Sequence, residues 1–239
     1  MWLTGKIISV TPQSPTTRAF KIQVPDVDKI DFKAGQFVIM DLPVHEKRLK
    51  RRRSYSIANA PDGTNILEFS VVKLPGGLGT TYLFDEAKVG TEITFKGPAG
   101  VFYLPEDVSN KHLVFICTGT GVAPFRSMIF DLINKQKPFK SIHLIFGTRT
   151  AEGILYRKEF EKLAAEREDF TYDVTLSREN HPDYTRGYVH RIYQEKYPKP
   201  SADTNIYLCG WQQMIDEAVK NLTEEVGFEK GQVVFELYG

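Results

Sequence analysis

Residues 111–127, KHLVFICTGTGVAPFRS, constrain the fold of this chain more than any other stretch. An apolar run at 113–117 has the length and composition of a buried strand, and it breaks abruptly into Gly119-Thr120-Gly121. A segment with Pro124 near its start then has the pattern of a helix. Glycines let the backbone approach a bulky anion, and the positive end of a helix favours negative charge. The stretch could hold a diphosphate, although a pair of glycines alone occurs more often in turns without a ligand.

From Lys111 onward, strand patterns and helix patterns alternate along the chain. This alternation is typical of a parallel sheet with crossover helices. Such sheets bind ligands outside the carboxyl ends of their strands, where Gly119, Thr148, Ser177 and Cys209 all fall. We expect strands over 113–117, 141–147, 170–177 and 205–210, and helices over 124–135, 156–167, 187–195 and 211–226.

Residues 2–104 follow a different pattern, in which short alternating runs are separated by frequent turn signals such as Pro-Asp-Gly and Pro-Gly-Gly. This spacing predicts an antiparallel barrel or sandwich, with one helix over 81–86. The polar stretch at 105–110 separates the two patterns. We therefore expect a fold of the β + α/β class: an N-terminal antiparallel β-barrel domain over residues 1–106, followed by a doubly wound parallel-sheet domain over residues 107–239.

Composition excludes several classes of function. The 31 basic and 30 acidic residues give a net charge of +1, so no general attraction to nucleic acid is expected. Two distant cysteines are too few for a disulfide framework or an iron–sulfur cluster, and the five histidines lack the spacing of a metal site or a triad. No apolar run approaches the roughly 20 residues of a membrane span. These features predict a soluble cytoplasmic protein without a metal, and we expect a monomer.

The densest polar signal in the first half is KRLKRRRSYSIANAP at 47–61. Alternation along a strand sends Arg53 and Tyr55 to one face and leaves Ser56 near the aromatic ring. Such a segment could hold a phosphate and a flat ring, although an isolated strand tyrosine is more often a core residue.

Six ordered motifs resemble those of the ferredoxin-NADP reductase family, and together they cover essentially the whole chain. The resemblance implies an FAD-binding barrel, an NAD(P)-binding α/β domain and a flavin-dependent reductase activity. The motifs are RSYS at 53–56, GGLGTTYL at 76–83, GPAGVFYL at 97–104, GTGVAPFRS at 119–127, FGTRT at 146–150 and YLCGWQQM at 207–214.

The resemblance implies specific contacts with FAD. Arg53 would pair with the pyrophosphate, Tyr55 would pack on the isoalloxazine, and Ser56 would form a hydrogen bond near flavin N5. A guanidinium suits phosphate oxygens. Further contacts would come from the backbone of Val71, Val72 and Lys73 and from the start of a helix at Gly77 and Thr80. Thr80 alone would be an ordinary helix cap.

For the nicotinamide nucleotide, the resemblance implies a diphosphate site, a 2′-phosphate site and a nicotinamide site. The diphosphate site would comprise Thr118, Gly119, Thr120, Gly121 and Pro124. The 2′-phosphate and adenine site would comprise Arg149, Ser177, Arg178, Arg186 and Tyr188, and the nicotinamide site would comprise Cys209 and Gly210.

The final residues, VVFELYG, resemble the glutamate-x-tyrosine ending of plant-type members. Tyr238 would then cover the flavin face where nicotinamide must stack. Gly239 departs from that ending, which leaves the tightness of this cover open. The catalytic set that the resemblance implies is Ser56, Cys209, Glu236 and Tyr238. These residues would orient the flavin and the nicotinamide and exclude water, since the two cofactors themselves perform the hydride transfer.

Four questions remain open at this point. Arginines at a strand end favour NADPH, but NADH-using relatives also have a Ser-Arg pair, and Glu179 adjoins Arg178. FAD is favoured over FMN by resemblance alone. The basic run at 47–52 would steer an acidic acceptor such as ferredoxin or flavodoxin, or it is merely a solvated loop. Alternative functions are an NAD(P)H-flavin or quinone reductase, a reductase subunit of a larger complex, and a nucleotide-binding regulatory protein.

Overall fold

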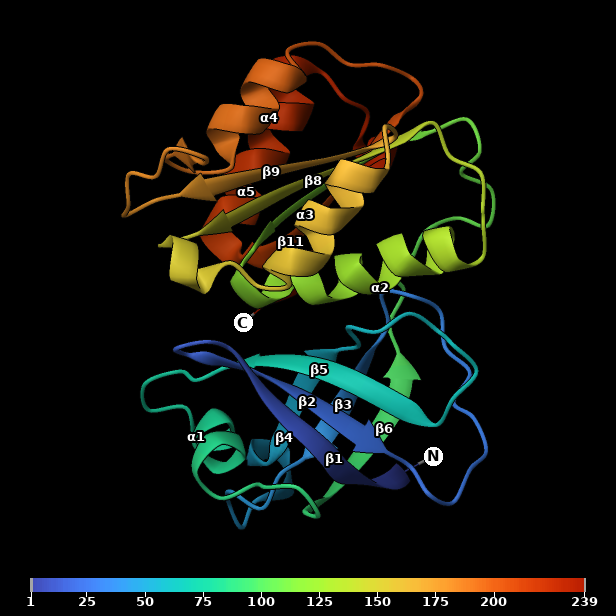
Figure 1. Ribbon diagram of the computed structural model, residues 1–239, viewed down its shortest axis with the longest axis vertical. Coiled ribbons are helices and arrows are strands. Elements are labelled where there is room, and N and C mark those ends of the chain that lie inside the picture. The colour runs from blue at the N-terminus through green and yellow to red at the C-terminus, as the bar shows by residue number, and fades with distance from the viewer. Residues whose placement is uncertain (1, 239) are drawn as a thin grey trace. The chain divides into compact units, whose positions relative to one another are not determined.

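The computed structural model describes residues 2–238, which form two compact units (Figure 1). One unit contains the chain up to Leu104 together with Ala123–Ile133, and the other contains Pro105–Val122 and the chain from Asn134 onward. Gly239 lies outside the described residues. The domain limits 1–106 and 107–239 remain a prediction.

The first unit is an antiparallel sheet of six strands in the order β4-β3-β6-β1-β2-β5. An isolated bridge between Ile57, directly after β4, and Phe69 of β5 joins the two outer strands, so the sheet closes into the expected barrel. The strands are β1 (Trp2–Ser14), β2 (Thr17–Gln23), β3 (Phe37–Asp41), β4 (Arg52–Ser56), β5 (Ile66–Val72) and β6 (Glu92–Ala99).

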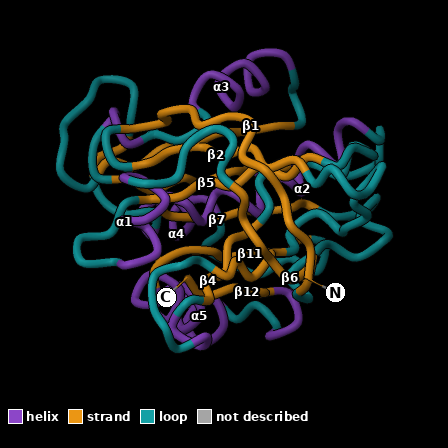
Figure 2. Tube along the Cα trace, turned by 90° about the horizontal axis from the view of Figure 1, so that it is seen from below, coloured by secondary structure: helices purple, strands orange, loops and turns teal. Residues whose placement is uncertain are grey.

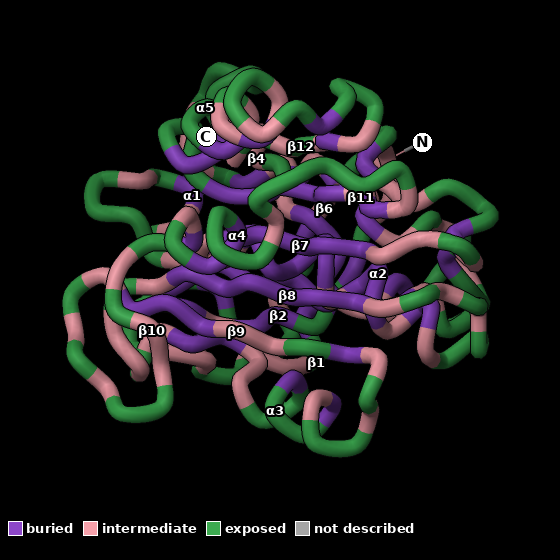
Figure 3. Tube along the Cα trace, turned by 90° about the horizontal axis from the view of Figure 1, so that it is seen from above, coloured by how far each residue is buried: buried purple, intermediate pink, exposed green. Residues whose placement is uncertain are grey.

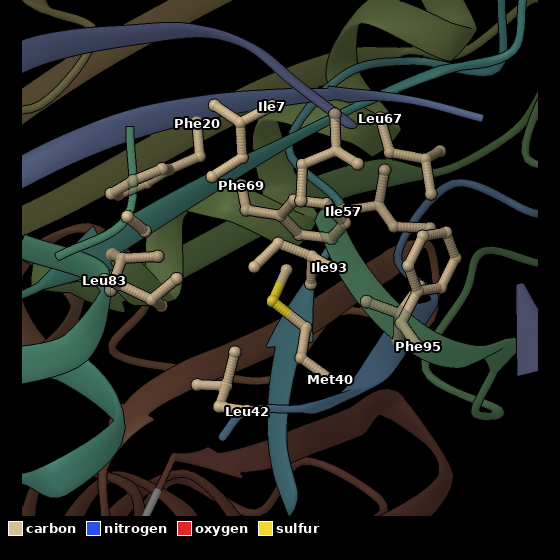
Figure 4. Packing of buried hydrophobic residues seen from close by; sticks show 14 of the residues in the cluster. Ile7, Phe20, Met40, Leu42, Ile57, Leu67, Phe69, Leu83, Ile93 and Phe95 are labelled. Atoms are coloured by element: carbon tan, nitrogen blue, oxygen red, sulfur yellow. The ribbon is translucent and has the colours of Figure 1, made fainter. Parts of the chain in front are cut away.

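Apolar side chains that alternate along these strands fill the barrel. Phe69 and Phe95 are fully buried and pack with Met40, Ile57 and their neighbours in one cluster (Figure 4). Helix α1 (Leu78–Asp85), purple in Figure 2, packs against the barrel through Leu83 and Phe84 of the same cluster. It begins earlier than the expected 81–86, because the turn at Gly77 starts the helical bonding with a Thr81 N to Gly77 O bond of 2.8 Å.

The second unit is a parallel sheet in the order β10-β9-β8-β7-β11-β12. Strands β7 and β8 are buried along most of their length, and α3 lies on the opposite side of the sheet from α4 and α5 (Figure 3). This is the expected doubly wound arrangement. The strands are β7 (His112–Thr118), β8 (Ser141–Thr148), β9 (Phe170–Leu176), β10 (Thr185–Arg186), β11 (Thr204–Trp211) and β12 (Val233–Tyr238); the helices are α3 (Arg157–Glu166), α4 (His190–Lys196) and α5 (Gln212–Lys220).

Besides α1, three helices have boundaries that differ from the sequence-based expectation by two or more residues. Helix α2 (Val122–Asn134) begins two residues early, since Pro124 fits the first turn, where no intrahelical N–H bond is needed. Helix α4 begins at His190 rather than 187, after the left-handed Gly187 at φ 122°. The expected helix over 211–226 is α-helical only to Lys220 and continues as a π-helix over Asn221–Val226. Within residues 2–238, no helix has the length and hydropathy needed to cross a membrane.

Candidate functional site

In the barrel unit, Arg53 lies against the amino-terminal turn of α1. A Cβ placed on Gly79 would lie 3.0 Å from Arg53 Cγ and 3.3 Å from Arg53 Nε. The guanidinium donates to the carbonyls of Arg52 at 2.7 Å and Lys50 at 3.0 Å. The first amides of a helix have no carbonyl partner within that helix and favour an anion. Arg53 and the start of α1 thus form a site with the donors that a diphosphate requires.

Tyr55 and Ser56 follow Arg53 on β4. Tyr55 is half-buried and packs against the barrel core. Burial raises the pKa of its phenol to about 12, although the charge of Arg53 acts in the opposite direction. Ser56 is 6% exposed. The tyrosine is thus a core-packed strand aromatic with part of its surface accessible, which allows both roles that the sequence left open.

The other expected flavin residues lie on β5 and before α1. Val71 is buried, and the Lys73 amide donates to Thr16 O at 2.7 Å, so this amide is already bonded within the barrel. The Lys73 ammonium pairs with Asp85 at 2.6 Å. The Thr80 hydroxyl accepts from the Leu74 amide at 3.1 Å and lies 3.1 Å from Gly77 O, which braces the turn before α1.

In the second unit, the glycine turn lies where the strand order reverses. The chain passes from β7 outward to β8 and β9 and then returns to β11 on the other side of β7. Ligands of open α/β sheets bind at this switch point. Gly119–Gly121 forms a 3-10 turn that continues into α2, with Pro124 in the first helical turn. A Cβ on Gly121 would lie 2.4 Å from Cys209 O, so only glycine fits this approach of the turn to β11.

Cys209, Glu236 and Tyr238 gather at the carboxyl ends of β11 and β12. Cys209 pairs in register with Glu236 and with Cys117. Burial raises the pKa of the Cys209 thiol well above its usual value, the Glu236 carboxylate raises it further, and a hydrogen bond with Tyr238 opposes them. Next to it, Gly210 lies close to Thr118, since an added Cβ would lie 2.3 Å from Thr118 Oγ1. Three of the four expected catalytic residues are therefore neighbours in this unit, while Ser56 lies on the barrel.

The expected 2′-phosphate and adenine residues lie just beyond the ends of β8 and β9, at the end of β10 and directly after it. The main-chain pairing of these strands continues past their ends, with Ser177 N donating to Thr148 O and Arg178 N to Arg149 O, both at 2.9 Å. This pairing places Arg149 and Arg178 side by side, and both are exposed. The Arg186 guanidinium donates to Asn180 Oδ1 at 2.7 Å, and Tyr188 is 72% exposed.

Two further features were missed by the sequence analysis. Glu179 accepts a hydrogen bond from the Ala151 amide at 2.8 Å, so its carboxylate is engaged by the loop after β8. Trp211 ends β11 with 58% of its surface exposed, and its amide lies 3.4 Å from Thr118 Oγ1. The sequence signal for Trp211 was its position directly after Cys209-Gly210. No sequence signal pointed to the Ala151 bond.

Comparison with known proteins agrees with this division into two binding units. Residues 4–103 match the oxidoreductase FAD-binding domain, and residues 115–220 match the oxidoreductase NAD-binding domain. The barrel with its cationic helix start and the parallel sheet with its glycine turn therefore define a flavin- and nicotinamide-nucleotide-binding oxidoreductase.

The chain belongs to the ferredoxin-NADP reductase family. It is 32% identical to ferredoxin-NADP reductase B of Sorangium cellulosum, over 98% of this chain and 96% of that protein. It is also 28% identical to a component of the Na⁺-translocating NADH-quinone reductase of Serratia proteamaculans, over 98% of this chain and 67% of that component. A ferredoxin NADP⁺ reductase structure from Neisseria gonorrhoeae, with bound FAD and NADP, is similar with a TM-score of 0.83 at 25% identity, and the match covers 99% and 98% of the two chains.

Proposed function

We propose that this protein takes a hydride from NADPH onto FAD and then passes single electrons to a ferredoxin or flavodoxin. The observation that supports the proposal is a pair of close approaches, that of Arg53 to the start of α1 and that of the glycine turn after β7 to β11 at the switch point of the sheet. When bound, the flavin and nicotinamide supply the redox chemistry. The chain's own residues bind, orient and shield them.

The residues near the reacting groups would act mainly by position. The buried Cys209 thiol is neutral at neutral pH because its pKa is raised, so it would provide a compact uncharged contact for the nicotinamide. Tyr238, whose hydroxyl acts on the pKa of that thiol, would cover the flavin until the nicotinamide displaces it. Ser56 would form a hydrogen bond near flavin N5.

Mass spectrometry of the released cofactor would distinguish FAD from FMN.

The preference for NADPH rests on Arg149, Arg178 and Glu179. The main chains that follow β8 and β9 are paired, and they hold the exposed Arg149 and Arg178 next to each other. Two guanidinium groups at one place suit a phosphate dianion. A site built for NAD uses a carboxylate to bind the ribose diol. The acidic residue that adjoins Arg178, Glu179, instead accepts the Ala151 amide. Steady-state kinetics with NADPH and NADH test the assignment, and a kcat/KM for NADH equal to or above that for NADPH would refute it.

An acidic protein is the electron acceptor that the basic segment 47–52 favours. Within this segment, Arg51 pairs with Asp41 at 2.8 Å, while Arg48 and Arg52 lie over the Trp2 ring at 5.3 and 5.5 Å. Lys47 and Lys50 are exposed, as is Leu49 at 80%. Two exposed cations beside an apolar side chain form a surface suited to an acidic partner with an apolar centre.

A second candidate function is that of an NADH-using reductase component of a larger complex, favoured by the similarity to the NADH-quinone reductase component of Serratia proteamaculans. Reduction rates with ferredoxin, flavodoxin, free flavin and quinones would separate the two functions.

Our proposal also includes an FAD domain over 1–106, an NAD(P) domain over 107–239, a cytoplasmic location and a monomeric state. Light scattering during gel filtration tests the last point.

A further inference from the structure

Helix α2 carries two adjacent polar side chains, Arg126 and Ser127, among buried apolar ones. Phe125, Met128 and Ile129 are buried beside Arg126 and Ser127, and Ser127 itself is fully buried. Buried polar groups persist in proteins when hydrogen bonds compensate their loss of water. The partners of these two side chains therefore indicate what the helix holds in place.

Both side chains bind the main chain that follows the flavin motif. Arg126 Nη1 donates to Ala58 O at 2.9 Å, and Ser127 Oγ donates to Asn59 O at 2.7 Å. Two consecutive helix residues thus hold two consecutive carbonyls. Ala58 and Asn59 lie two and three positions after Ser56, the last residue of β4.

Glu68 of β5 holds the same segment from another element. The Ala58 amide donates to Glu68 O at 2.8 Å, and the Glu68 amide donates to Asn59 Oδ1 at 2.8 Å. Glu68 is buried, with 7% of its surface exposed, and its carboxylate Oε1 lies 3.7 Å from Arg126 Nη1. We call this set of five residues the 58–59 clamp: Ala58, Asn59, Glu68, Arg126 and Ser127.

We propose that Arg126 and Ser127 are positioning residues for the flavin motif. By fixing the carbonyls of Ala58 and Asn59 they hold the end of β4, and with it Ser56, at the place that flavin N5 requires. This inference rests on the proposed function. Displacements of about 1 Å at a distance from the reacting atoms can lower a rate by up to about a hundredfold.

The test compares Arg126→Ala, Arg126→Lys and Ser127→Ala with the wild-type holoenzyme. Arg157→Ala is the charge-matched control, because Arg157 forms an exposed ion pair with Glu161. Anaerobic stopped-flow absorbance gives the limiting rate of flavin reduction, and the flavin spectrum reports on its environment. We expect Arg126→Ala to lower the limiting rate by about ten- to a hundredfold, with KM for NADPH changed less than about twofold. Arg126→Lys should restore part of the rate, since an ammonium can still donate to Ala58 O.

A purely structural role would lower the unfolding temperature and leave the reduction rate and flavin spectrum unchanged, and this outcome would overturn the inference. If Arg126→Ala does not fold, wild-type rates in both Arg126→Lys and Ser127→Ala would overturn it as well. A wild-type protein that NADPH does not bleach would refute the proposed function instead. In that case amide hydrogen exchange at residues 57–60 tests the 58–59 clamp by itself. Ser127→Ala should accelerate this exchange, and an unchanged exchange rate would overturn the clamp.

Discussion

The stem of Arg53 passes directly against Gly79, since an added Cβ at Gly79 would lie 3.0 Å from Arg53 Cγ. The contact brings a cation from β4 to the first turn of α1, where unpaired amides and the helix dipole already favour an anion. A β-branched side chain at position 79 would push the arginine away while leaving the charge of the chain unchanged.

Gly79→Val should therefore weaken FAD binding by about ten- to a hundredfold, the range expected when charge-assisted bonds are lost. Fluorescence titration of the apoprotein with FAD measures this. Leu78→Ala is the control, because the Leu78 side chain is exposed in the same helical turn. Equal FAD affinity in wild type and Gly79→Val would show that Arg53 does not act at the flavin phosphates.

Gly121→Ala should destabilise the second unit and abolish nucleotide binding. The new methyl group would lie 2.4 Å from Cys209 O and 2.7 Å from its carbonyl carbon, both main-chain atoms, so the turn itself must move. We expect a loss of about 1–3 kcal/mol in the free energy of unfolding. Urea denaturation and NADP⁺ difference spectroscopy measure the two effects. Gly231→Ala is the matched control, because no atom lies within 4 Å of its added Cβ.

Arg178→Ala should raise KM for NADPH at least about tenfold, because charge-assisted bonds to the 2′-phosphate are lost. The kcat/KM for NADH should change less than about twofold, because NADH lacks that phosphate. Lys158→Ala on the exposed side of α3 controls for the loss of a positive charge. Parallel losses with both nucleotides would place Arg178 outside the 2′-phosphate site.

Cys209 should contribute no pH dependence to the rate of flavin reduction between about pH 6.5 and 8.5. Its folded-state pKa lies well above the reference value of 9.0, because burial and Glu236 disfavour the thiolate. Cys209 therefore stays protonated below pH 9. It loses its proton only at higher pH, as the pH passes the folded-state pKa of the thiol. Stopped-flow reduction of wild type and Cys209→Ser across this range checks it. A Cys209-dependent step near the ordinary thiol pKa of about 8.5 would contradict it.

Reduction of a protein acceptor should slow as ionic strength rises, because screening weakens long-range attraction to the basic segment. Lys47→Glu with Lys50→Glu should lower the second-order rate more than Arg51→Ala, since Arg51 is already paired with Asp41. Rates for free flavin as acceptor should change little. Acceptor rates that stay flat from low to high salt would rule out docking at this segment.

Much of this architecture could be predicted from local pattern. The apolar run at 113–117 and the glycines that follow it predict β7 and its turn because strand period and turn chemistry are local properties. The π-helical end at Asn221–Val226 was not predictable in the same way, because its residues keep an ordinary helical pattern.

The parts of the site that the sequence analysis missed depend on contacts between distant residues. The sequence analysis includes Arg126 and Ser127 in the motif at 119–127 without a role of their own, and only the structure shows their bonds to Ala58 and Asn59. Glu179 looked like a rival for the ribose diol until the Ala151 amide was seen to engage it. Sequence spacing carries no information on such pairings.

The most direct test of the central claim is an anaerobic titration of the purified protein with NADPH. The account predicts a yellow protein with bound FAD whose visible flavin absorbance bleaches on adding NADPH and recovers when a ferredoxin or flavodoxin acceptor is supplied. A colourless protein that does not take up FAD, or a yellow protein that NADPH does not bleach, would contradict it.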